Sequence, residues 1–299
     1  MTSLNSNLHG AKRAKNDEFY TRLEDVEAEL VHYENHFRDK TVYLNCDDQS
    51  SAFWQYFSER FDDLGLRRLA ATKYPEGLQF RQDRDKGLQV IQLTGDGDFR
   101  SDECVELLKQ ADIVVTNPPF SLFREYVAQL VEYGKKFLVI GNMNAVTYRE
   151  IWPRIQGGGL WLGVKHPKRF QVPDDAPRRA SQGVNPLGKR EQQFGNIGWF
   201  TNLDHTRRHA ELPLVRKYTP DEYPTYDNYD AINVNKVKEI PVDYDGVMGV
   251  PITFLDKFNP DQFEIVGLDS DDPSEWVGCG PRVNGRAKYR RIFVKRKAR

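Results

Sequence analysis

The chain has 299 residues, of which 39% are hydrophobic, a formal net charge of −1 and three scattered cysteines. That length suits one large α/β domain, or a catalytic domain with a smaller appended region. No apolar run is long enough for a membrane span, and the start of the chain is too polar for a signal peptide. The cysteines do not have the spacing of a disulfide framework or a zinc site. We therefore expect a cytoplasmic protein without a metal.

The first 22 residues form a polar arm, and an amphipathic helix is expected after it. Three- and four-residue steps separate Leu23, Val26, Leu30, Tyr33 and Phe37, which places them on one helical face. Strand-like and helix-like segments then alternate. We expect strands at 41–46, 66–72, 89–93, 112–116 and 136–140, and helices at 50–61, 101–110 and 122–133. This alternation predicts an α/β fold with a mainly parallel sheet and helices on both faces, in which ligands bind beyond the carboxyl ends of the strands.

The composition and the periodicity of the sequence change after about residue 150. Residues 165–193 are rich in Pro, Arg, Gly and Gln and show little periodicity, which predicts a long loop that is either functional or partly disordered. Later strands are expected at 196–200 and 252–254. We therefore divide the chain into an arm (1–22), a core (23–156) and a remainder (157–299) that carries the last core strands, a recognition loop and a basic tail.

The most informative motif is Asn117-Pro118-Pro119-Phe120, which directly follows a predicted Ile/Val strand. Two prolines cannot donate ladder hydrogen bonds, so the strand must end there, where ligands bind. The side-chain oxygen of Asn117 and the carbonyl of Pro118 can both accept hydrogen bonds from an amino group, which makes the nitrogen lone pair available for attack on a methyl sulfonium. Phe120 offers a ring face for a planar base, a contact that contributes roughly 1–3 kcal/mol. The alternative is a Pro-Pro turn capped by Asn117.

The ordered set of motifs resembles the EcoRI-type adenine-specific DNA methyltransferase family, in which Asn-Pro-Pro is followed by Phe or Tyr. The resemblance covers most of the chain and implies a Rossmann-like S-adenosylmethionine-dependent methyltransferase with an antiparallel strand near the end of its sheet and irregular DNA-contacting elements after it. It rests on these stretches, in order: Phe19-Tyr20-Thr21, Cys46-Asp47-Asp48, Gly95-Asp96-Gly97-Asp98-Phe99, Asn117-Pro118-Pro119-Phe120, 199–203 and 252–260.

The resemblance also implies a cofactor site. Phe19, Tyr20 and Thr21 match the motif that covers the methionine end of S-adenosylmethionine. Asp98 and Phe99 match the pair that holds its adenine, because a carboxylate can accept a hydrogen bond from the adenine amino group and an aromatic ring can pack on the base.

Asp47 matches the region after the first strand that usually binds the methionine moiety. One departure from the family pattern lies here, because most such enzymes carry a Gly-rich loop and residues 45–51 contain no glycine. The alternative for Asp47 and Asp48 is an N-terminal cap on the following helix.

The implied reaction is direct methyl transfer to the N6 amino group of an adenine flipped out of duplex DNA, without a covalent enzyme intermediate or a metal. The implied setting is restriction-modification or DNA protection in a phage or its host, with a cognate restriction endonuclease as a candidate partner. Two alternatives stay open: an amino-methyltransferase that acts on RNA or protein glutamine, and an inactive DNA-binding relative. His205 and His209 lack the glutamate of a zinc-protease helix, which argues against a metal site.

The near-neutral net charge argues weakly against a nucleic-acid partner, but the charge is segregated along the chain. Nine Lys or Arg and no acid lie between Arg282 and Arg299, an acidic patch precedes them at 269–275, and a second basic stretch covers 165–190. A protein with this segregation can bind DNA on one face, and the alternative is solvated surface. We expect the tail to contact phosphates and the stretch at 178–193 to read bases. The candidate DNA-binding residues are Arg178, Arg179, Lys189, Arg190, Arg290 and Arg291.

Overall fold

The computed structural model describes residues 19–172, 182–269 and 280–297. It divides into two compact units, Met1–Ile151 with Leu162–Asp204 and Trp152–Trp161 with His205–Arg299. The last strands of the core therefore belong to the first unit, and the division lies near residue 204 rather than at 156. Outside the described residues lie the first 18 residues of the arm, Arg178 and Arg179, most of the acidic patch at 269–275, and Cys279.

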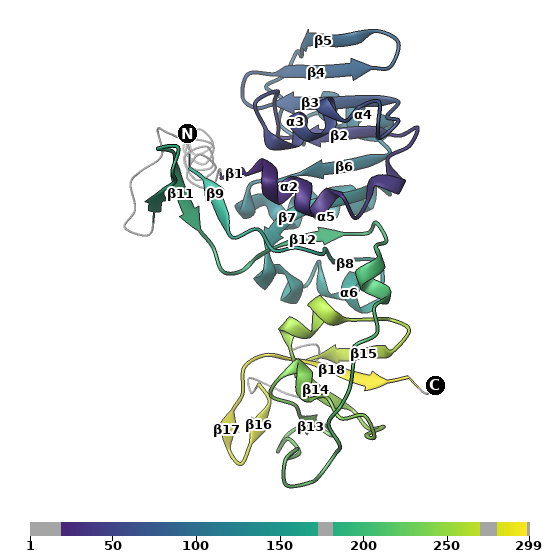
Figure 1. Cartoon of the computed structure of the whole chain (residues 1–299), viewed down its shortest axis with the longest axis vertical. Helices are drawn as coiled ribbons and strands as arrows, with labels where there is room; N and C mark the ends of the chain where they lie inside the picture. Colours follow the sequence, from purple (N-terminus) through teal and green to yellow (C-terminus); the bar gives the residue numbers. More distant parts are fainter. Residues whose placement is uncertain (1–18, 173–181, 270–279, 298–299) are drawn as a thin grey trace, which may run out of the picture. The chain divides into compact units, whose positions relative to one another are not determined.

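The first unit is built around an eight-stranded sheet in the order β5-β4-β3-β2-β6-β7-β12-β8 (Figure 1). Its centre consists of four neighbouring parallel strands: β3 (Arg68–Lys73), β2 (Thr41–Asn45), β6 (Ile113–Thr116) and β7 (Lys136–Asn142). Antiparallel strands flank this centre: β4 (Leu78–Asp83) and β5 (Gly87–Gln92) on one side, and β12 (Ile197–Thr201) on the other. The short strand β8 (Trp161–Leu162) follows β12 in the sheet.

The predicted parallel centre and the antiparallel strand near the end are confirmed. Strand β4 is absent from the sequence prediction because four of its six residues are polar. It is nevertheless fully paired between β3 and β5. Tertiary pairing, which local polarity does not reveal, decides its structure.

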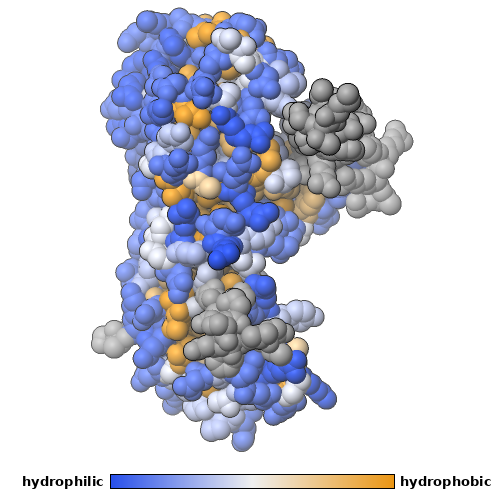
Figure 2. Space-filling view, turned by 180° about the vertical axis from the view of Figure 1, so that it is seen from behind, coloured by the Kyte–Doolittle hydropathy of each residue, from blue (hydrophilic) through white to orange (hydrophobic). Residues whose placement is uncertain are grey.

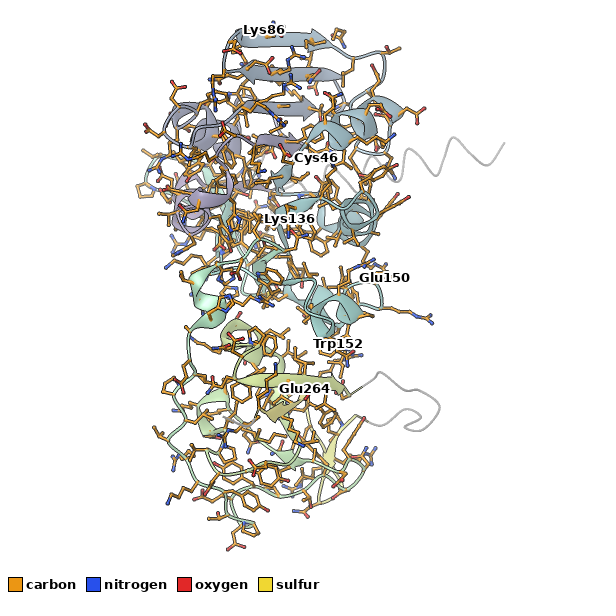
Figure 3. The ribbon with its side chains drawn as sticks, turned by 90° about the vertical axis from the view of Figure 1, so that its right-hand side faces the viewer. Cys46, Lys86, Lys136, Glu150, Trp152 and Glu264 are labelled. Carbon is orange, nitrogen blue, oxygen red and sulfur yellow. The ribbon has the colours of Figure 1, made fainter. Side chains whose placement is uncertain are left out.

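Helices cover both faces of this sheet, as Figure 3 shows for the first unit. Helices α2 (Leu23–Leu30) and α3 (Ala52–Glu59) share one core cluster with Val42 and Leu44 of β2. Tyr43 points to the opposite face because side chains alternate along a strand. That face carries α4 (Asp102–Gln110) and α5 (Phe123–Glu132), where Phe123 of α5 contacts Phe200 of β12 with ring centroids 4.9 Å apart.

The predicted apolar face of the first helix is buried, although the helix is shorter than expected. Helix α2 ends at Leu30, and a 3₁₀ turn, η1 (Glu34–His36), continues the chain. Val26, Leu30, Tyr33 and Phe37 are all 0% exposed and Leu23 is partly buried, so the sequence spacing identified four of the five residues as buried correctly.

A second sheet of the first unit joins strands that lie far apart in the sequence. Its antiparallel order is β1 (Tyr20–Thr21), β9 (Arg169–Gln171), β11 (Arg190–Gln193) and β10 (Gln182–Val184). The prediction of a long loop over 165–193 is therefore wrong for residues 169–171, 182–184 and 190–193, which form strands. Strands of two to four residues are too short to show a period of two in the sequence.

The second unit contains a four-stranded sheet and a separate hairpin. The sheet order is β13 (Ile232–Asn233), β14 (Met248–Pro251), β18 (Arg291–Arg296) and β15 (Phe263–Leu268). The hairpin consists of β16 (Arg282–Val283) and β17 (Arg286–Ala287), and a short helix, α6 (Trp152–Gln156), packs against β15. The strand expected at 252–254 is instead the 3₁₀ helix η6 (Ile252–Lys257), because Pro251 ends β14 just before it.

The basic tail is not free. Strand β18 lies between β14 and β15, and its residues Ile292, Phe293 and Val294 are at most 6% exposed. The segment predicted as a tail that contacts phosphates therefore forms a sheet strand, because its three consecutive apolar residues can be buried while Lys295 stays exposed.

Among the described residues, no helix is long and apolar enough to cross a membrane. In the same residues, no group of three or more His, Cys, Asp or Glu side chains could hold a metal ion. Figure 2 shows a largely hydrophilic face with apolar residues in separate patches.

Candidate active site

The site lies at the carboxyl edge of the parallel strands. Strand β2 ends at Asn45 and its neighbour β6 ends at Thr116, so the segments that follow them meet at one edge. The hydroxyl oxygen of Thr116 lies 2.5 Å from the backbone carbonyl of Asn45 and 2.6 Å from Oδ2 of Asp47. The fold thus brings together the Asp47 loop and the Asn117 motif, as the sequence predicts.

The side chain of Asn117 is fixed by the arm. Its Nδ2 donates a hydrogen bond of 2.7 Å to the backbone carbonyl of Phe19. Its Oδ1 is buried and has no hydrogen-bond partner in the described part of the chain. A buried acceptor without a partner costs about 1–3 kcal/mol, so this oxygen is a favourable position for a donor group from a ligand.

Four phenylalanines from the arm, the motif and the small sheet pack together beside Asn117. The Phe120 ring is nearly parallel to that of Phe19, at 24° with centroids 6.3 Å apart, and lies edge-on to Phe194 at 6.2 Å and Phe170 at 6.5 Å. Phe194 also contacts Phe19 at 4.7 Å. Sequence reasoning missed Phe170 and Phe194 because they come from β9 and the end of β11, at least 50 residues after the motif. No local pattern could have shown that these strands return to it.

The Asp47 loop forms a sharp turn without glycine. Cys46 adopts a left-handed φ of 73°, a conformation that costs about 1 kcal/mol for a residue other than glycine. The cap of α3 is Ser51, whose hydroxyl accepts a hydrogen bond of 3.0 Å from the Trp54 backbone N–H. The alternative that Asp47 or Asp48 caps this helix is therefore wrong, and Asp48 instead accepts hydrogen bonds from the backbone and side chain of Ser50.

The two carboxyl groups of the loop differ in protonation. Burial raises the pKa of Asp47 from 3.8 to about 7, although hydrogen bonds from Thr116 and Ser51 oppose the rise. Burial also acts to raise the pKa of Asp48, but hydrogen bonds from Ser50 and the nearby ammonium of Lys73 outweigh it, and that pKa is lowered. At neutral pH, Asp48 is ionised and Asp47 is close to its midpoint.

The loop at 95–99 packs on the end of β3, next to the Asp47 loop. Gly97 has a φ of 85°, and a side chain there would meet the Lys73 backbone carbonyl, so glycine is required. Lys73 also pairs with Asp48 at 3.2 Å. The loop at 95–99, the Asp47 loop and the Asn117 motif therefore gather at the ends of three neighbouring strands, β3, β2 and β6, and the arm motif is bound to the last of them.

Asp98 and Phe99 are exposed to different extents. Asp98 accepts hydrogen bonds of 2.9 and 2.6 Å from the Arg100 guanidinium, and its side chain is 23% exposed. Burial acts to raise the pKa of Asp98, but the Arg100 hydrogen bonds outweigh it and the pKa is lowered. Phe99 is only 3% exposed, with the Tyr126 ring at 5.1 Å and the Arg100 guanidinium carbon 5.2 Å from its centroid. Asp98 is thus accessible to a ligand, whereas Phe99 forms part of the interior behind it.

The remaining arm residues lie beside the motif. Tyr20 is 53% exposed, and Thr21 is 8% exposed with an Oγ1 that is buried and lacks a hydrogen-bond partner within the described ranges. Both belong to β1, which pairs with β9. The arm motif therefore joins the small sheet, through β1, to Asn117, through the Phe19 carbonyl.

The candidate DNA-binding residues differ in exposure. Lys189 is exposed between β10 and β11, Arg190 is half-buried, and Arg290 is exposed before β18. Arg291 is 5% exposed, and its guanidinium donates hydrogen bonds to the backbone carbonyls of Tyr289 and Arg290. This burial argues against the predicted contact between Arg291 and DNA, because the side chain is bonded within the second unit.

A family model described as "Adenine-specific methyltransferase EcoRI" matches residues 7–87 and 76–297, which is nearly the whole chain. The chain belongs to the EcoRI family of adenine-specific methyltransferases. All four motifs at the carboxyl edge lie within the matched residues. As a member of this family, the protein is an adenine-specific methyltransferase.

Relatives in this family span the same length. The chain is 47% identical over 324 residues to the type II methyltransferase M.EcoRI of Escherichia coli, covering 98% of this chain and 97% of the relative. It is 42% identical over 309 residues to the type II methyltransferase M.MpnI of Mycoplasma pneumoniae, and 39% identical over 309 residues to M.MgeORF184P of Mycoplasma genitalium; each alignment covers 96% of this chain and 97% of the relative. No solved structure matches the chain.

Proposed function

We propose that this methyltransferase transfers a methyl group from S-adenosylmethionine to the N6 amino nitrogen of an adenine flipped out of duplex DNA. The observation that carries the proposal is the buried Oδ1 of Asn117, held without a partner beside Phe120 at the carboxyl edge of β6. The parallel centre of the sheet and its antiparallel flank at β12 support a Rossmann-like fold for this chemistry.

The residues at the carboxyl edge fit S-adenosylmethionine. That cofactor carries an ammonium, a carboxylate, a sulfonium and an adenine amino group, and it supplies an electrophilic methyl group on the sulfonium. Asp47 and Asp98 offer carboxyl groups at the ends of neighbouring strands, and the buried Oγ1 of Thr21 lacks a partner in the described residues. An acidic set of this kind favours a ligand that carries positive charge and donor groups.

The protein's own groups would prepare the adenine nitrogen. The Oδ1 of Asn117 and the carbonyl of Pro118 accept the two amino hydrogens, which draws the nitrogen lone pair out of conjugation with the ring. The Nδ2 of Asn117 is bound to the Phe19 carbonyl at 2.7 Å, so the amide cannot rotate freely and its oxygen stays oriented. Phe120 supplies the face on which the base stacks. Because N6 is out of reach inside a duplex, the base must flip.

The relatives named type II methyltransferases support a role in restriction-modification, with a cognate endonuclease as partner. For DNA contacts we retain Lys189, Arg190 and Arg290, which are exposed or half-buried, together with Arg178 and Arg179, which lie outside the described residues. Phosphate contacts by such side chains give affinity without sequence information.

The experiment is a methyl-transfer assay with labelled S-adenosylmethionine on duplex DNA, RNA and protein, followed by sequencing of modified adenines in DNA from cells that express the protein. We expect label on duplex DNA and N6-methyladenine in one sequence context. Label on RNA or protein alone would refute the DNA assignment. The Asn117→Ala variant is the matched inactive control.

A further inference from the structure

Among the described residues of the first unit, the hairpin of β10 and β11 carries the most exposed large apolar side chains. Leu187 is 83% exposed and Val184 is 70% exposed. Val184 is the last residue of β10, and Leu187 lies in the segment 185–189, which links the two strands. When a partner covers an apolar side chain that is this exposed to water, the free energy of the system falls.

The sequence fixes the shape of this turn. Asn, Pro and Gly occupy the first, second and fourth positions, the preferred residues of a type I turn, and Gly188 has the left-handed φ of 78° that closes such a hairpin. The Asn185 Oδ1 accepts hydrogen bonds of 3.0 and 2.9 Å from the backbone N–H groups of Leu187 and Lys189. Leu187 therefore stands at the tip of a braced turn rather than on a loose loop.

The charge of the hairpin and of the strand next to it favours a polyanion. The described residues of 163–172 and 182–197 contain five basic residues and one acid. The acid, Glu191, is 8% exposed, and its carboxylate accepts a hydrogen bond of 3.1 Å from the Asn185 Nδ2. Its negative charge therefore contributes little at the surface. Lys189 and Arg190 directly follow the tip, whereas the exposed Lys165, Lys168 and Arg169 lie toward the other end of the hairpin, where Arg169 pairs with Gln193. These five residues form the basic surround of the hairpin. An apolar tip with a basic surround suits duplex DNA better than an apolar protein surface.

The hairpin is tied to the catalytic motif. Strand β11 ends at Gln193, and the next residue, Phe194, contacts the ring of Phe120. Figure 1 shows the small sheet beside the main sheet of the same unit. Seven residues separate Leu187 from Phe194, so the tip lies at most about 25 Å from Phe194. With a rise of about 3.4 Å per base pair, that reach corresponds to about seven base pairs.

We propose that Leu187 is a wedge that enters the base stack of duplex DNA within about seven base pairs of the target adenine and kinks the helix there. This inference rests on the proposed function. An apolar side chain between two base steps is buried by the bases, and the bend it produces brings more backbone onto the basic surround. The kink would hold the duplex so that the adenine can reach Asn117.

The test uses the full-length protein and duplexes that carry 2-aminopurine, a base whose fluorescence rises on unstacking, at successive steps on either side of the target adenine. With wild-type protein we expect a rise at one step besides the target. Leu187→Ala should abolish that rise, reduce the bend measured by energy transfer between the duplex ends, and weaken binding roughly tenfold. Leu187→Met should retain all three. Val215→Ala, at a residue that is 80% exposed in the second unit, is the matched control.

The outcomes separate the two proposals. If wild-type protein methylates the duplex but Leu187→Ala unstacks and bends it equally, the wedge is refuted and the proposed function stands. An unstacked step more than about seven base pairs from the target would also refute the wedge. If wild-type protein neither binds nor methylates duplex DNA, the proposed function itself fails. Lys189→Ala should lower the salt dependence of binding while leaving the unstacked step in place.

Discussion

The side-chain nitrogen of Asn117 donates a hydrogen bond of 2.7 Å to the backbone carbonyl of Phe19, across 98 residues of sequence. This contact ties the arm motif to the motif after β6. It also decides which end of the amide faces the ligand, because the nitrogen is used internally and the oxygen is left buried without a partner in the described chain.

Asn117→Ala should lose more than about tenfold in methyl transfer, equivalent to about 1.4 kcal/mol of transition-state stabilisation. Cofactor binding should stay nearly intact, since only the target amino group loses its acceptor. Turnover with labelled cofactor and calorimetry check the two parts. Asn144→Ala, at an exposed asparagine after β7, is the control. A variant with more than a tenth of wild-type turnover would show that Asn117 is not the amino acceptor.

Phe120→Tyr and Phe120→Trp should be tolerated, whereas Phe120→Ala should lose about tenfold or more in turnover on duplex DNA. The ring also packs among Phe19, Phe170 and Phe194, so an alanine could loosen this cluster. Phe120→Leu keeps apolar volume without a ring face and separates the two effects. Equal turnover of the Leu and Tyr variants would contradict the stacking role.

Cofactor affinity should fall as the pH drops below about 7. Asp47 has a pKa near 7 because of burial, and it must lose its proton before it can pair with a cationic group. Below that pH the affinity should decrease by about one decade per pH unit, and above it should be flat. Calorimetry between pH 5.5 and 8.5 measures this, and Asp47→Asn should remove the dependence. A pH profile that is identical in both proteins would exclude Asp47 as the titrating group.

The same group affects folding. Because the folded pKa of Asp47 lies above its ordinary 3.8, the folded state binds the proton more tightly than the unfolded chain does. The free energy of unfolding should therefore decrease as the pH rises from about 4 to about 7. Denaturant titrations of wild-type protein and Asp47→Asn across this window should diverge in that direction.

Asp98→Ala should weaken cofactor binding about tenfold or more, because a hydrogen bond to a carboxylate contributes roughly 1.5–3 kcal/mol. The pKa of Asp98 is lowered, so this contribution should not change between pH 6 and 9. Calorimetry provides the measurement, and DNA binding should be little affected. Asp85→Ala, at an exposed aspartate between β4 and β5, serves as control. Unaltered cofactor affinity would rule out Asp98 as a ligand of the adenine.

Truncation before Arg290 should unfold the second unit. It removes β18, whose buried Ile292, Phe293 and Val294 contribute about 1.5–3 kcal/mol each, comparable in sum to the stability of a domain. Limited proteolysis and thermal unfolding would detect the loss. Arg290→Ala keeps the strand and should instead reduce the salt slope of DNA binding by about one unit. A truncated protein with an unchanged second unit would show that β18 is dispensable.

The sequence alone determined the central architecture and the catalytic motif. Alternation of apolar strands and amphipathic helices is a local property, so β2, β3, β6, β7 and the helices around them could be predicted within a few residues. The prolines after β6 also act locally, since they end a strand wherever they occur. The order of the motifs along the chain identifies the Asp47 and Asp98 motifs. A parallel sheet then predicts that they meet at the edge where its strands end.

The tertiary structure decided what depends on distant partners. Strands of two to four residues such as β1, β9, β10 and β11 have no stable local pattern and form only because they pair with one another. Their pairing brings Phe170 and Phe194 to Phe120. In the same way, a segment that the sequence presents as a basic tail forms β18, between two other strands of its sheet. Hydrogen bonding between distant segments and burial among them are properties of the folded chain, so neither the free oxygen of Asn117 nor the raised pKa of Asp47 could be derived from the order of residues.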